Sequence, residues 1–378
     1  NIYSDKVSWK LDSDSISINE KKFNVGNGNQ KVMVESVHFF DSQEWRRIQA
    51  LSSKHPLAEL VRYSNQEGGL SLDANKYAKF LNPKWDVSNI QSLLYELVKM
   101  GFINYYHDRK LLEVKDKVFH YAAASQDKAD YDVIRLTSDA KGTNAFFDIK
   151  QKEIKTGGIK VLELSATQKV AAKPINDEII LKQNRDIDFD GKLFAGYSNF
   201  LGKDFSFNYD KFHVEMDSIR YFDLFLLTGE MDKKGQPLAE SLASRIEHAS
   251  GILLIDGPEN KSGKDEIPLF PSFESKAPSY VYYDDKSIRG GCYYRDSFYF
   301  ELDPFSFVSL DQFNKEALSF KGTMVSSTIF PDFKETLLLQ EDDFSLGFTT
   351  NSPAEGWSNY LGKGHFKGEV SLSNNGFL

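Results

Sequence analysis

The sequence predicts an α+β protein that is mostly β, and three observations indicate this class. Aromatic residues make up 14% of the 378 residues, with 30 Phe and 18 Tyr, and aromatic side chains suit the half-buried surface of a strand. The spacing of apolar residues is strand-like at first, helical from about residue 41, and strand-like again after about residue 140. Gly, Asn, Asp and Pro separate the strand-like segments. We therefore expect a β segment over 1–40, a helical module over 41–140 and a β-rich region over 141–378.

The first segment alternates polar and apolar residues in short runs, for example at Val7, Trp9 and Leu11. This period of two is typical of strands, and NVGNGNQ (24–30) is expected to form a turn between them. The chain begins at NIYSDKVSW with neither Met nor a signal peptide, and it ends at LSNNGFL within an expected strand. We therefore expect the β segment to continue from a longer parent chain.

Helix signals follow one another from Asp41. Asp86 suits an N-cap, and Gly101 suits the left-handed residue that ends a helix. Helices are predicted over SQEWRRIQALSS (42–53), HPLAELVRYSNQ (55–66), SLDANKYAKFL (71–81), the apolar stripe of residues 87–98, and KVFHYAAASQ (117–126). Ahead of the last helix, FINYY and KLLEV lie on either side of HDRK and predict a hairpin. This order of helices and hairpin is that of a winged helix-turn-helix, so we expect a winged-helix-like module.

The charge distribution argues against nucleic acid as the partner of this module. Residues 41–117 carry 12 basic and 10 acidic side chains, a net charge of +2. Because the whole chain has a net charge of −9, the remaining residues carry −11. The outward face of the expected reading helix offers Asn89 and Gln91 but no basic residue before Lys99. DNA binding needs several phosphate contacts as well as base contacts. We therefore expect the module to serve in packing or protein contact, with DNA binding as the lesser alternative.

The β-rich region is expected to contain one helix, over PLAESLASRIEHA (237–249). Three segments within it share the order Phe-x-Gly-x-aliphatic, namely FDGKLFAG (189–196), FKGTMVSS (320–327) and FKGEVSLS (366–373). Short strands separated by Gly at irregular spacing predict an elongated β-solenoid or a large stacked sheet. The spacing is too irregular to define a true repeat.

The segment SYVYYDDKSIRGGCYYRDSFYFELDPF (279–305) is the densest aromatic stretch of the chain. Alternate positions of a strand would turn one row of tyrosines outward, next to two arginines. Exposed Tyr beside Arg suits a protein interface or a platform for a sugar. The alternative is an aromatic ladder inside the core. The candidate ligand-binding or partner-binding residues are Tyr280, Tyr282, Arg289, Tyr294 and Arg295.

A second candidate site is NRDIDFDG (184–191), where Asp186, Asp188 and Asp190 are spaced two apart. On a strand they would share one face, where three carboxylates suit Ca²⁺ or acid–base chemistry on a polysaccharide. The alternative is a solvated strand face with Ile187 and Phe189 turned inward. Calcium is therefore the one cofactor left open.

No catalytic residue is predicted, because no known signature of a catalytic site occurs in the sequence. The seven histidines are scattered without an HExxH pattern, and no G-x-S-x-G pattern marks a hydrolase nucleophile. The single cysteine, Cys292, has no histidine near it in sequence, which argues against a nucleophile. No run of 18 apolar residues predicts a transmembrane segment.

Several phrases together resemble a group of large, uncharacterised, β-rich proteins of Bacteroidota. They are HPLAELVRY, LVKMGFI, VKDKVFHY, DYDVI, RDIDFDGKLFAG, FSFNYDKF, LIDGPENKSG, SYVYYDD, FYFELDPF, TIFPDFKETL and YLGKGHF, which span residues 55 to 378. The resemblance implies a much longer parent protein that is exported or associated with the bacterial cell envelope. It supplies no site residue.

These observations favour a non-enzymatic structural or protein-interaction component of a bacterial cell-envelope assembly, with other envelope proteins as its partners. A carbohydrate-binding or carbohydrate-active β-helix is the first alternative, with a glycan as ligand. A related alternative is an apolar groove that carries lipid across the envelope, and the DNA-binding winged helix is the last.

Overall fold

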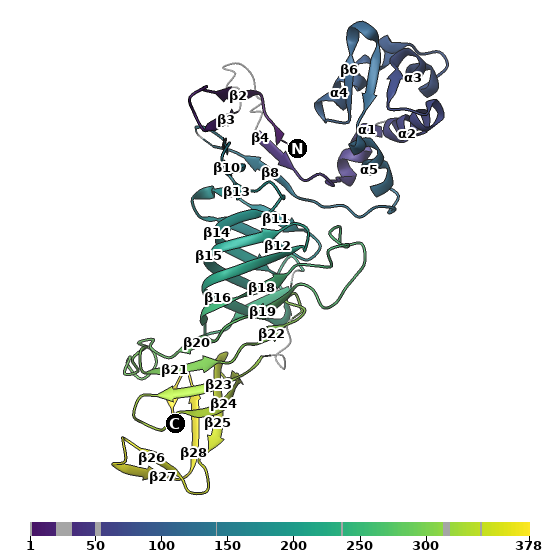
Figure 1. The fold of residues 1–378 in the computed structure, drawn as a ribbon. Coiled ribbons are helices and arrows are strands. Elements are labelled where there is room, and N and C mark those ends of the chain that lie inside the picture. Colours follow the sequence, from purple (N-terminus) through teal and green to yellow (C-terminus); the bar gives the residue numbers. More distant parts are fainter. Residues whose placement is uncertain are drawn as a thin grey trace. The chain divides into compact units, whose positions relative to one another are not determined.

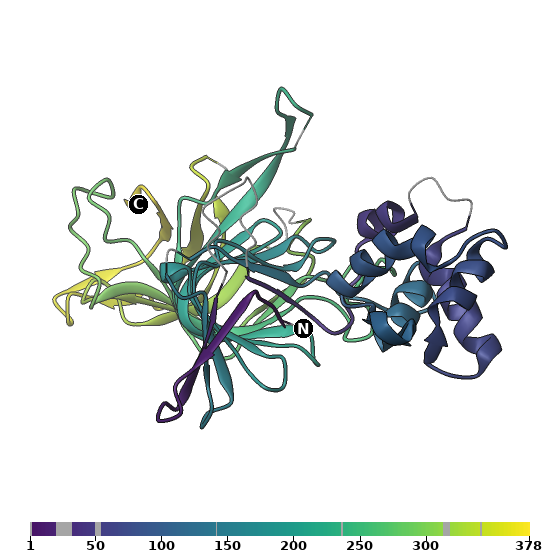
Figure 2. The same cartoon turned by 90° about the horizontal axis from the view of Figure 1, so that it is seen from above.

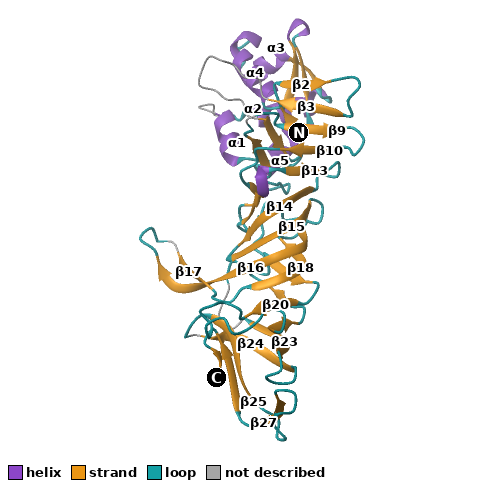
Figure 3. Ribbon diagram, turned by 90° about the vertical axis from the view of Figure 1, so that its left-hand side faces the viewer, coloured by secondary structure: helices purple, strands orange, loops and turns teal. Residues whose placement is uncertain are grey.

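The computed structural model describes residues 2–19, 32–49, 54–140, 142–235, 237–312, 318–340 and 342–378. The fold is mostly β, with 44% strand, 16% helix and large antiparallel sheets, so the class predicted from composition is confirmed (Figures 1 and 3). The chain divides into two compact units. We call residues 35–135 with 259–264 the helical unit, and residues 2–34, 136–258 and 265–378 the strand unit. The turn expected at 24–30 lies outside the described residues.

The α-helices of the described chain all belong to the helical unit, as Figure 2 shows. Helices are confirmed within each of the five ranges predicted for this unit, although residues 50–53 of the first range lie outside the described residues. The fourth helix begins with a turn of 3-10 helix. The helices are α1 (Ser42–Gln49), α2 (Pro56–Glu67), α3 (Ala74–Leu81), η1 (Val87–Ile90) leading into α4 (Gln91–Lys99), and α5 (Asp116–Ala124).

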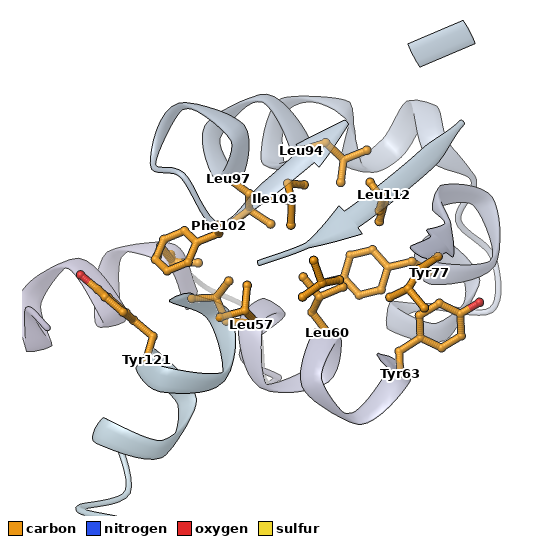
Figure 4. Close-up of a cluster of buried hydrophobic side chains, with 14 of the residues drawn as sticks. Leu57, Leu60, Tyr63, Tyr77, Leu94, Leu97, Phe102, Ile103, Leu112 and Tyr121 are labelled. Carbon is orange, nitrogen blue, oxygen red and sulfur yellow. The ribbon is translucent and has the colours of Figure 1, made fainter. Parts of the chain in front are cut away.

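A three-stranded antiparallel sheet completes the helical unit. The expected hairpin is present as β6 (Ile103–Tyr106) and β7 (Leu111–Val114), and β5 (Ser71–Asp73) pairs with the other side of β7. The helix predicted over 71–81 is wrong for its first three residues, which form β5, because three residues are too few to show the period of a strand. One apolar core joins helices and sheet, including Leu60, Leu94 and Leu112 (Figure 4).

Polar caps define where these helices begin. Asp73 accepts a hydrogen bond from the Lys76 backbone N–H, and Asp86 forms a capping box with Asn89. Gly101 ends α4 at φ 75°, the left-handed conformation that the sequence predicted. The N-cap of α2 is His55, whose Nδ1 accepts from the Leu57 N–H while Nε2 lies 2.8 Å from the Trp45 carbonyl oxygen. Both bonds are made together only by a neutral ring with its proton on Nε2.

A buried group of charges joins the two ends of the helical unit. The Glu35 carboxylate is 3% exposed and lies 2.6 Å from the guanidinium of Arg135 and 3.1 Å from the Lys117 ammonium. Arg135 also contacts Glu44 at 2.8 Å, and its guanidinium lies 4.1 Å above the Phe39 ring. Burial by itself lowers the pKa of Arg135, but the hydrogen bonds to Glu44 and Glu35 raise it above its usual value. The ion pairs of this group hold residues 35 and 135 together.

Residues 259–264, far along the chain, also belong to the helical unit. The backbone N–H groups of Lys261 and Ser262 donate to the two carboxylate oxygens of Asp130, both at 2.9 Å. Lys264 donates to the Asp127 carbonyl oxygen at 2.6 Å. The loop is thus held by one carboxylate, a contact between residues about 130 positions apart that no sequence pattern signals.

The strand unit is built from strands that pair antiparallel with neighbours in the chain. The longest ladder runs from β14 (Ile187–Ala195) to β15 (Ser198–Asn208), β16 (His213–Met231) and β18 (Ile246–Leu254). It continues through β20 (Ser279–Tyr282), β21 (Phe298–Leu302), β23 (Ser319–Ser326), β24 (Phe333–Gln340) and β25 (Ser345–Asn351). Strands at either end extend it. They are β2 (Lys6–Trp9), β3 (Ser15–Asn19), β9 (Ala145–Asp148), β10 (Glu153–Thr156), β13 (Ile179–Leu181), β28 (Glu369–Ser373) and β29 (Gly376–Phe377).

Shorter strands flank this ladder. They are β11 (Leu162–Ser165) and β12 (Val170–Pro174) beside β14, β17 (Pro237–Ser241) beside β16, and β19 (Ser272–Ser275) with β22 (Ser306–Phe307) beside β18. A hairpin of β26 (Trp357–Asn359) and β27 (Gly364–Phe366) stands apart, and β1 (Ile2–Tyr3), β4 (Val32–Glu35) and β8 (Arg135–Ser138) form a small sheet. The described residues form large antiparallel sheets, and no solenoid is identified among them.

The helix predicted over 237–249 is wrong. These residues form β17 and the start of β18, and they pair with the two parts of β16, for example Ala239 with Leu227 and Glu247 with Tyr221. Leu, Ala and Glu favour helix in isolation, but the ladder with a 19-residue strand overrides this weak preference.

Glycines allow phenyl rings to cover neighbouring strands on the inward face. A Cβ on Gly322 would lie 2.0 Å from the Glu301 carbonyl oxygen and 2.5 Å from the Phe300 ring. A Cβ on Gly251 would likewise meet the Phe273 ring, and a Cβ on Gly202 would meet the Phe205 ring. Of the three Phe-x-Gly segments in the sequence, those at 189 and 320 place Gly within a strand, whereas Gly368 joins β27 to β28. The glycines are thus sites of close approach between strands and rings.

The buried charges of the helical unit give the first prediction. Replacing Glu35 by Ala removes the carboxylate shared by Lys117 and Arg135, and loss of one member of a buried ion group costs about 3 kcal/mol or more. Chemical unfolding monitored by circular dichroism will measure this loss. Arg47→Ala, which removes an exposed pair with Glu96, is the control and should cost about 1 kcal/mol or less. Equal losses in the two variants would contradict the role of Glu35.

The close approach at Gly322 gives the second prediction. Gly322→Ala forces the added Cβ against a backbone oxygen and a buried ring, so we expect destabilisation by about 1–3 kcal/mol. Gly157→Ala is the matched control, because nothing lies within 4 Å of its Cβ position. Thermal unfolding of both variants measures the difference, and similar melting temperatures would show that the sheet relaxes freely around Gly322.

The cap at His55 gives the third prediction. Burial lowers the pKa of His55 below its ordinary value of 6.5, and the hydrogen bond to the Trp45 carbonyl only partly offsets this. As the pH falls, the unfolded chain therefore binds a proton at this imidazole before the folded chain does. The contribution of His55 to the free energy of unfolding is fully present above pH 6.5 and is lost as the pH falls through the pKa of the folded state. We expect His55→Asn, which keeps an N-cap, to lose less unfolding free energy between pH 7.5 and 5.5 than the wild type. The same loss in both proteins would exclude His55 as the titrating group.

Candidate functional site

The outward face of four neighbouring strands of the strand unit carries a group of aromatic rings. Alternation places them there, because Val281, Phe298 and Phe300 between them point into the core. The register brings the rings together across the ladder, with Tyr282 opposite Tyr299. We call the following set the tyrosine face: Tyr221 on β16, His248 on β18, Tyr280 and Tyr282 on β20, and Tyr299 on β21.

The rings contact one another closely. Tyr280 and Tyr282 are stacked with centroids 6.0 Å apart, and Tyr299 lies 5.6 Å from the first and 6.2 Å from the second. His248 stands edge-on to both stacked rings, at 6.4 and 6.1 Å. It can do so because β18 has an irregular register here and His248 adopts φ 56°. The result is a half-buried platform of four rings.

Arg295 lies over this platform. Its guanidinium is 3.9 Å from the centroid of Tyr282 and donates through both Nη atoms to the Glu247 carboxylate, at 2.8 and 2.9 Å. Its Nε donates to Asp284 at 2.9 Å. The hydrogen bonds to Glu247 raise the pKa of Arg295 above its usual value, despite partial burial. Burial raises the pKa of Tyr282, against the opposing effect of Arg295, so this phenol stays neutral in physiological solution.

A second arginine repeats this arrangement on the neighbouring strands. The Arg245 guanidinium lies 3.9 Å from the Tyr221 ring, and its Nε donates to Asp223 at 2.7 Å. Both arginines and Tyr282 line a hollow of about 660 Å³, whose other walls come from Asp223, Glu247, Asn374 and residues 241–244 and 284–288. The hollow therefore presents the Tyr282 ring beside hydrogen-bonding groups that are held in place.

The structure brings together three of the five residues predicted from the aromatic stretch. Tyr280, Tyr282 and Arg295 belong to the tyrosine face or contact it. Arg289 lies elsewhere, and its Nη2 donates to the Phe377 carbonyl oxygen at 3.1 Å. Tyr294 is 72% exposed and is not part of the ring group. The two residues outside the group lie on the connection between β20 and β21, whose path the alternation of strands does not determine.

Sequence reasoning missed Tyr221, His248 and Tyr299 as members of the site. Tyr299 could have been found, because FYFEL alternates and places it on the same face as Glu301. Tyr221 and His248 come from strands far back in the chain, and the second of these was predicted to be helical. Only strand pairing brings them to the platform.

The three aspartates predicted as a carboxylate site have separate roles. Asp186 precedes β14 and is 8% exposed, and it accepts hydrogen bonds from the Tyr209 N–H at 2.9 Å and from Asn184 at 2.5 Å. Asp188 pairs with Lys182 and accepts from Ser206 at 2.8 Å. Asp190 accepts from the Asp204 N–H at 2.9 Å. Asp188 and Asp190 line a hollow of about 520 Å³ that does not include Asp186.

The described residues contain no group of three or more His, Cys, Asp or Glu placed to hold a metal ion. Among the carboxylates that line the two hollows, Asp188 is paired with lysine, Asp190 accepts from a backbone N–H, and Glu247 is paired with arginine. Among the helices that the structure describes, none is long and apolar enough to cross a membrane.

The tyrosine face thus presents aromatic rings beside a guanidinium group and carboxylates that hydrogen bonds hold in place. Neither a protein-family model, nor a curated protein, nor a solved structure matches this chain.

Proposed function

We propose that this chain is a non-enzymatic structural or protein-interaction component of a bacterial cell-envelope assembly. In this proposal the helical unit is a winged-helix-like docking module and the strand unit is a rigid scaffold. The envelope setting rests on the resemblance described from the sequence. The role in protein contact rests on the surface of the helical unit.

The topology of the helical unit supports the comparison with winged helices. The order α2, β5, α3, α4, β6, β7 and the sheet order β5-β7-β6 are those of a helix-turn-helix followed by a wing. In this comparison α4 is the helix that would read DNA. Its outward surface therefore decides between DNA and protein as the partner.

The observation that carries the proposal is the partly aromatic outward surface of α4, whose charged side chains are Glu96 and Lys99. Tyr95 is 51% exposed and Val98 is 39% exposed, and Ser88 and Ser92 lie exposed before them. The one acidic residue of the helix, Glu96, is paired with Arg47 at 2.7 Å. Exposed tyrosine and apolar side chains are enriched where proteins bind proteins.

DNA as the partner is opposed by the same surface. Phosphate contacts supply most of the affinity of a DNA-binding module, and the η1–α4 segment (87–99) has only Lys99, at its last position. The N-cap of η1 is the carboxylate of Asp86, which would face a phosphate at this end. The helical unit is thus suited to a neutral partner surface.

A lipid-carrying groove is opposed by the interior of the strand unit. Such a groove requires a continuous apolar trough, whereas the phenyl rings of the inward face pack on one another. Phe273 contacts Phe200 at 5.1 Å and Phe222 at 5.7 Å, and Phe320 contacts Phe305 at 5.1 Å. These contacts are typical of a filled core.

The fourth prediction tests the docking surface of α4. A photoreactive crosslinker placed at Ser92 in the tagged parent protein should give one discrete crosslinked envelope protein in native cells. The double variant Tyr95→Ser, Val98→Ser should lower the yield of that product at least tenfold, because the contacting surface is lost.

Two results would contradict this proposal. One is a parent protein that purifies alone and forms no discrete crosslinked product. The other is salt-sensitive binding of duplex DNA that Lys99→Ala weakens. The control variant Tyr360→Ser also removes an exposed tyrosine, 52% exposed and in the strand unit, and it should leave the crosslinked product unchanged.

A further inference from the structure

We propose that the outward face of β14 to β21 is a binding groove for an uncharged oligosaccharide chain. The proposal concerns the strand unit and does not depend on the docking role of the helical unit. The tyrosine face lies beside further hollows on the same sheet.

Three hollows follow one another across the sheet. The first, of about 520 Å³, contains Asp188, Asp190 and Lys182, and it shares Ile175 and Asp217 with the second, of about 500 Å³. The second hollow reaches His248, whose ring contacts Tyr280 and Tyr282. Tyr282 in turn lines the third hollow, of about 660 Å³. The first two hollows therefore adjoin, and the contact of His248 with Tyr282 brings the second beside the third. Each hollow has the size of an ordinary ligand pocket.

The net negative charge of the groove disfavours an anionic ligand. The first hollow contains two ion pairs, Lys182 with Asp188 and Lys155 with Glu178. Three further aspartates also line it, namely Asp190, Asp204 and Asp217. In the third, both arginines are engaged by carboxylates. The three hollows together are lined by nine carboxylates and seven lysine or arginine side chains, with Lys203 and Arg220 in the second hollow and Lys286 in the third, so the surplus of charge is negative. Nucleic acid, anionic lipid headgroups and acidic polysaccharides would be repelled.

The form of the groove favours a sugar chain over a peptide. An extended peptide binds to a sheet through the free N–H and C=O groups of an edge strand, but this groove lies on the face, where the ladder uses those groups. A pyranose ring has an apolar C–H face and a rim of hydroxyl groups. The apolar C–H face can pack on the half-buried rings of Tyr280 and Tyr299. The hydroxyl groups can donate to the carboxylates of Glu247 and Asp284, which are held in place.

The fifth prediction tests this groove by isothermal titration calorimetry of the full chain. The probes are cellohexaose, xylohexaose, mannohexaose, maltohexaose and N-acetylchitohexaose, with polygalacturonate as an anionic probe. We expect at least one neutral hexaose to bind and polygalacturonate not to bind. Tyr282→Ala and Tyr280→Ala should each weaken the affinity at least tenfold, because each removes one face of the platform.

Tyr294→Ala is the matched control, since this tyrosine is exposed in the same stretch of sequence but lies outside the ring group. It should bind as the wild type does. If Tyr282→Ala fails to fold by circular dichroism, tyrosine fluorescence of the wild type on titration provides a second measurement, and it should change with the neutral hexaose alone. Failure of all neutral hexaoses to bind, preferential binding of polygalacturonate, or equal losses in Tyr280→Ala and Tyr294→Ala would each overturn the proposal.

Discussion

The buried pairing of Glu35 with Arg135 is the constraint on which the helical unit depends. These residues are 100 positions apart, and they stand where the chain enters and leaves the helical unit. Lys117 on α5 binds the same carboxylate, and Glu44 on α1 binds the same guanidinium, so both terminal helices are fixed by one charge group. Because desolvation offsets much of the attraction between buried charges, such a group specifies geometry more than it adds net stability. It allows a helical unit to be inserted between strands with its ends held together.

The strand unit is held together in a different way, by rings placed over glycines. At Gly202, Gly251 and Gly322 a phenyl ring occupies the space that a side chain would take. Because a glycine weakens a strand when nothing covers it, the pairing of Gly with Phe explains why so many aromatic residues are compatible with an ordered sheet. The same alternation that turns Phe298 and Phe300 inward turns Tyr299 outward. The core and the tyrosine face are therefore two consequences of one pattern.

Local patterns predicted the helical unit well and the strand unit less well. Asp86, Gly101 and the stripe from Val87 to Val98 act within one or two turns of helix, so their effect is visible in the sequence. The helix prediction for residues 237–249 failed for the opposite reason. The conformation of this segment depends on its pairing with β16, a strand that ends only a few residues earlier. Antiparallel partners were not predicted for any strand beyond the hairpin at 103–114. Pairing is a long-range property that composition and period do not encode separately for each strand.

The candidate site shows the same division between local and long-range information. Tyr280 and Tyr282 were predicted because they alternate within one strand, whereas the carboxylates that fix Arg295 come from Glu247 and Asp284 on either side of the ring group. Those carboxylates change what the site can bind. An unpaired arginine over a tyrosine would attract anions, but Arg295 and Arg245 are engaged by carboxylates, so their planar groups act as fixed hydrogen-bond donors rather than as free charges. Recognition on this face must then come from ring contacts and directed hydrogen bonds, which are short-ranged and insensitive to salt. A surface of this kind selects its ligand by shape, and it can do so although the chain as a whole is acidic.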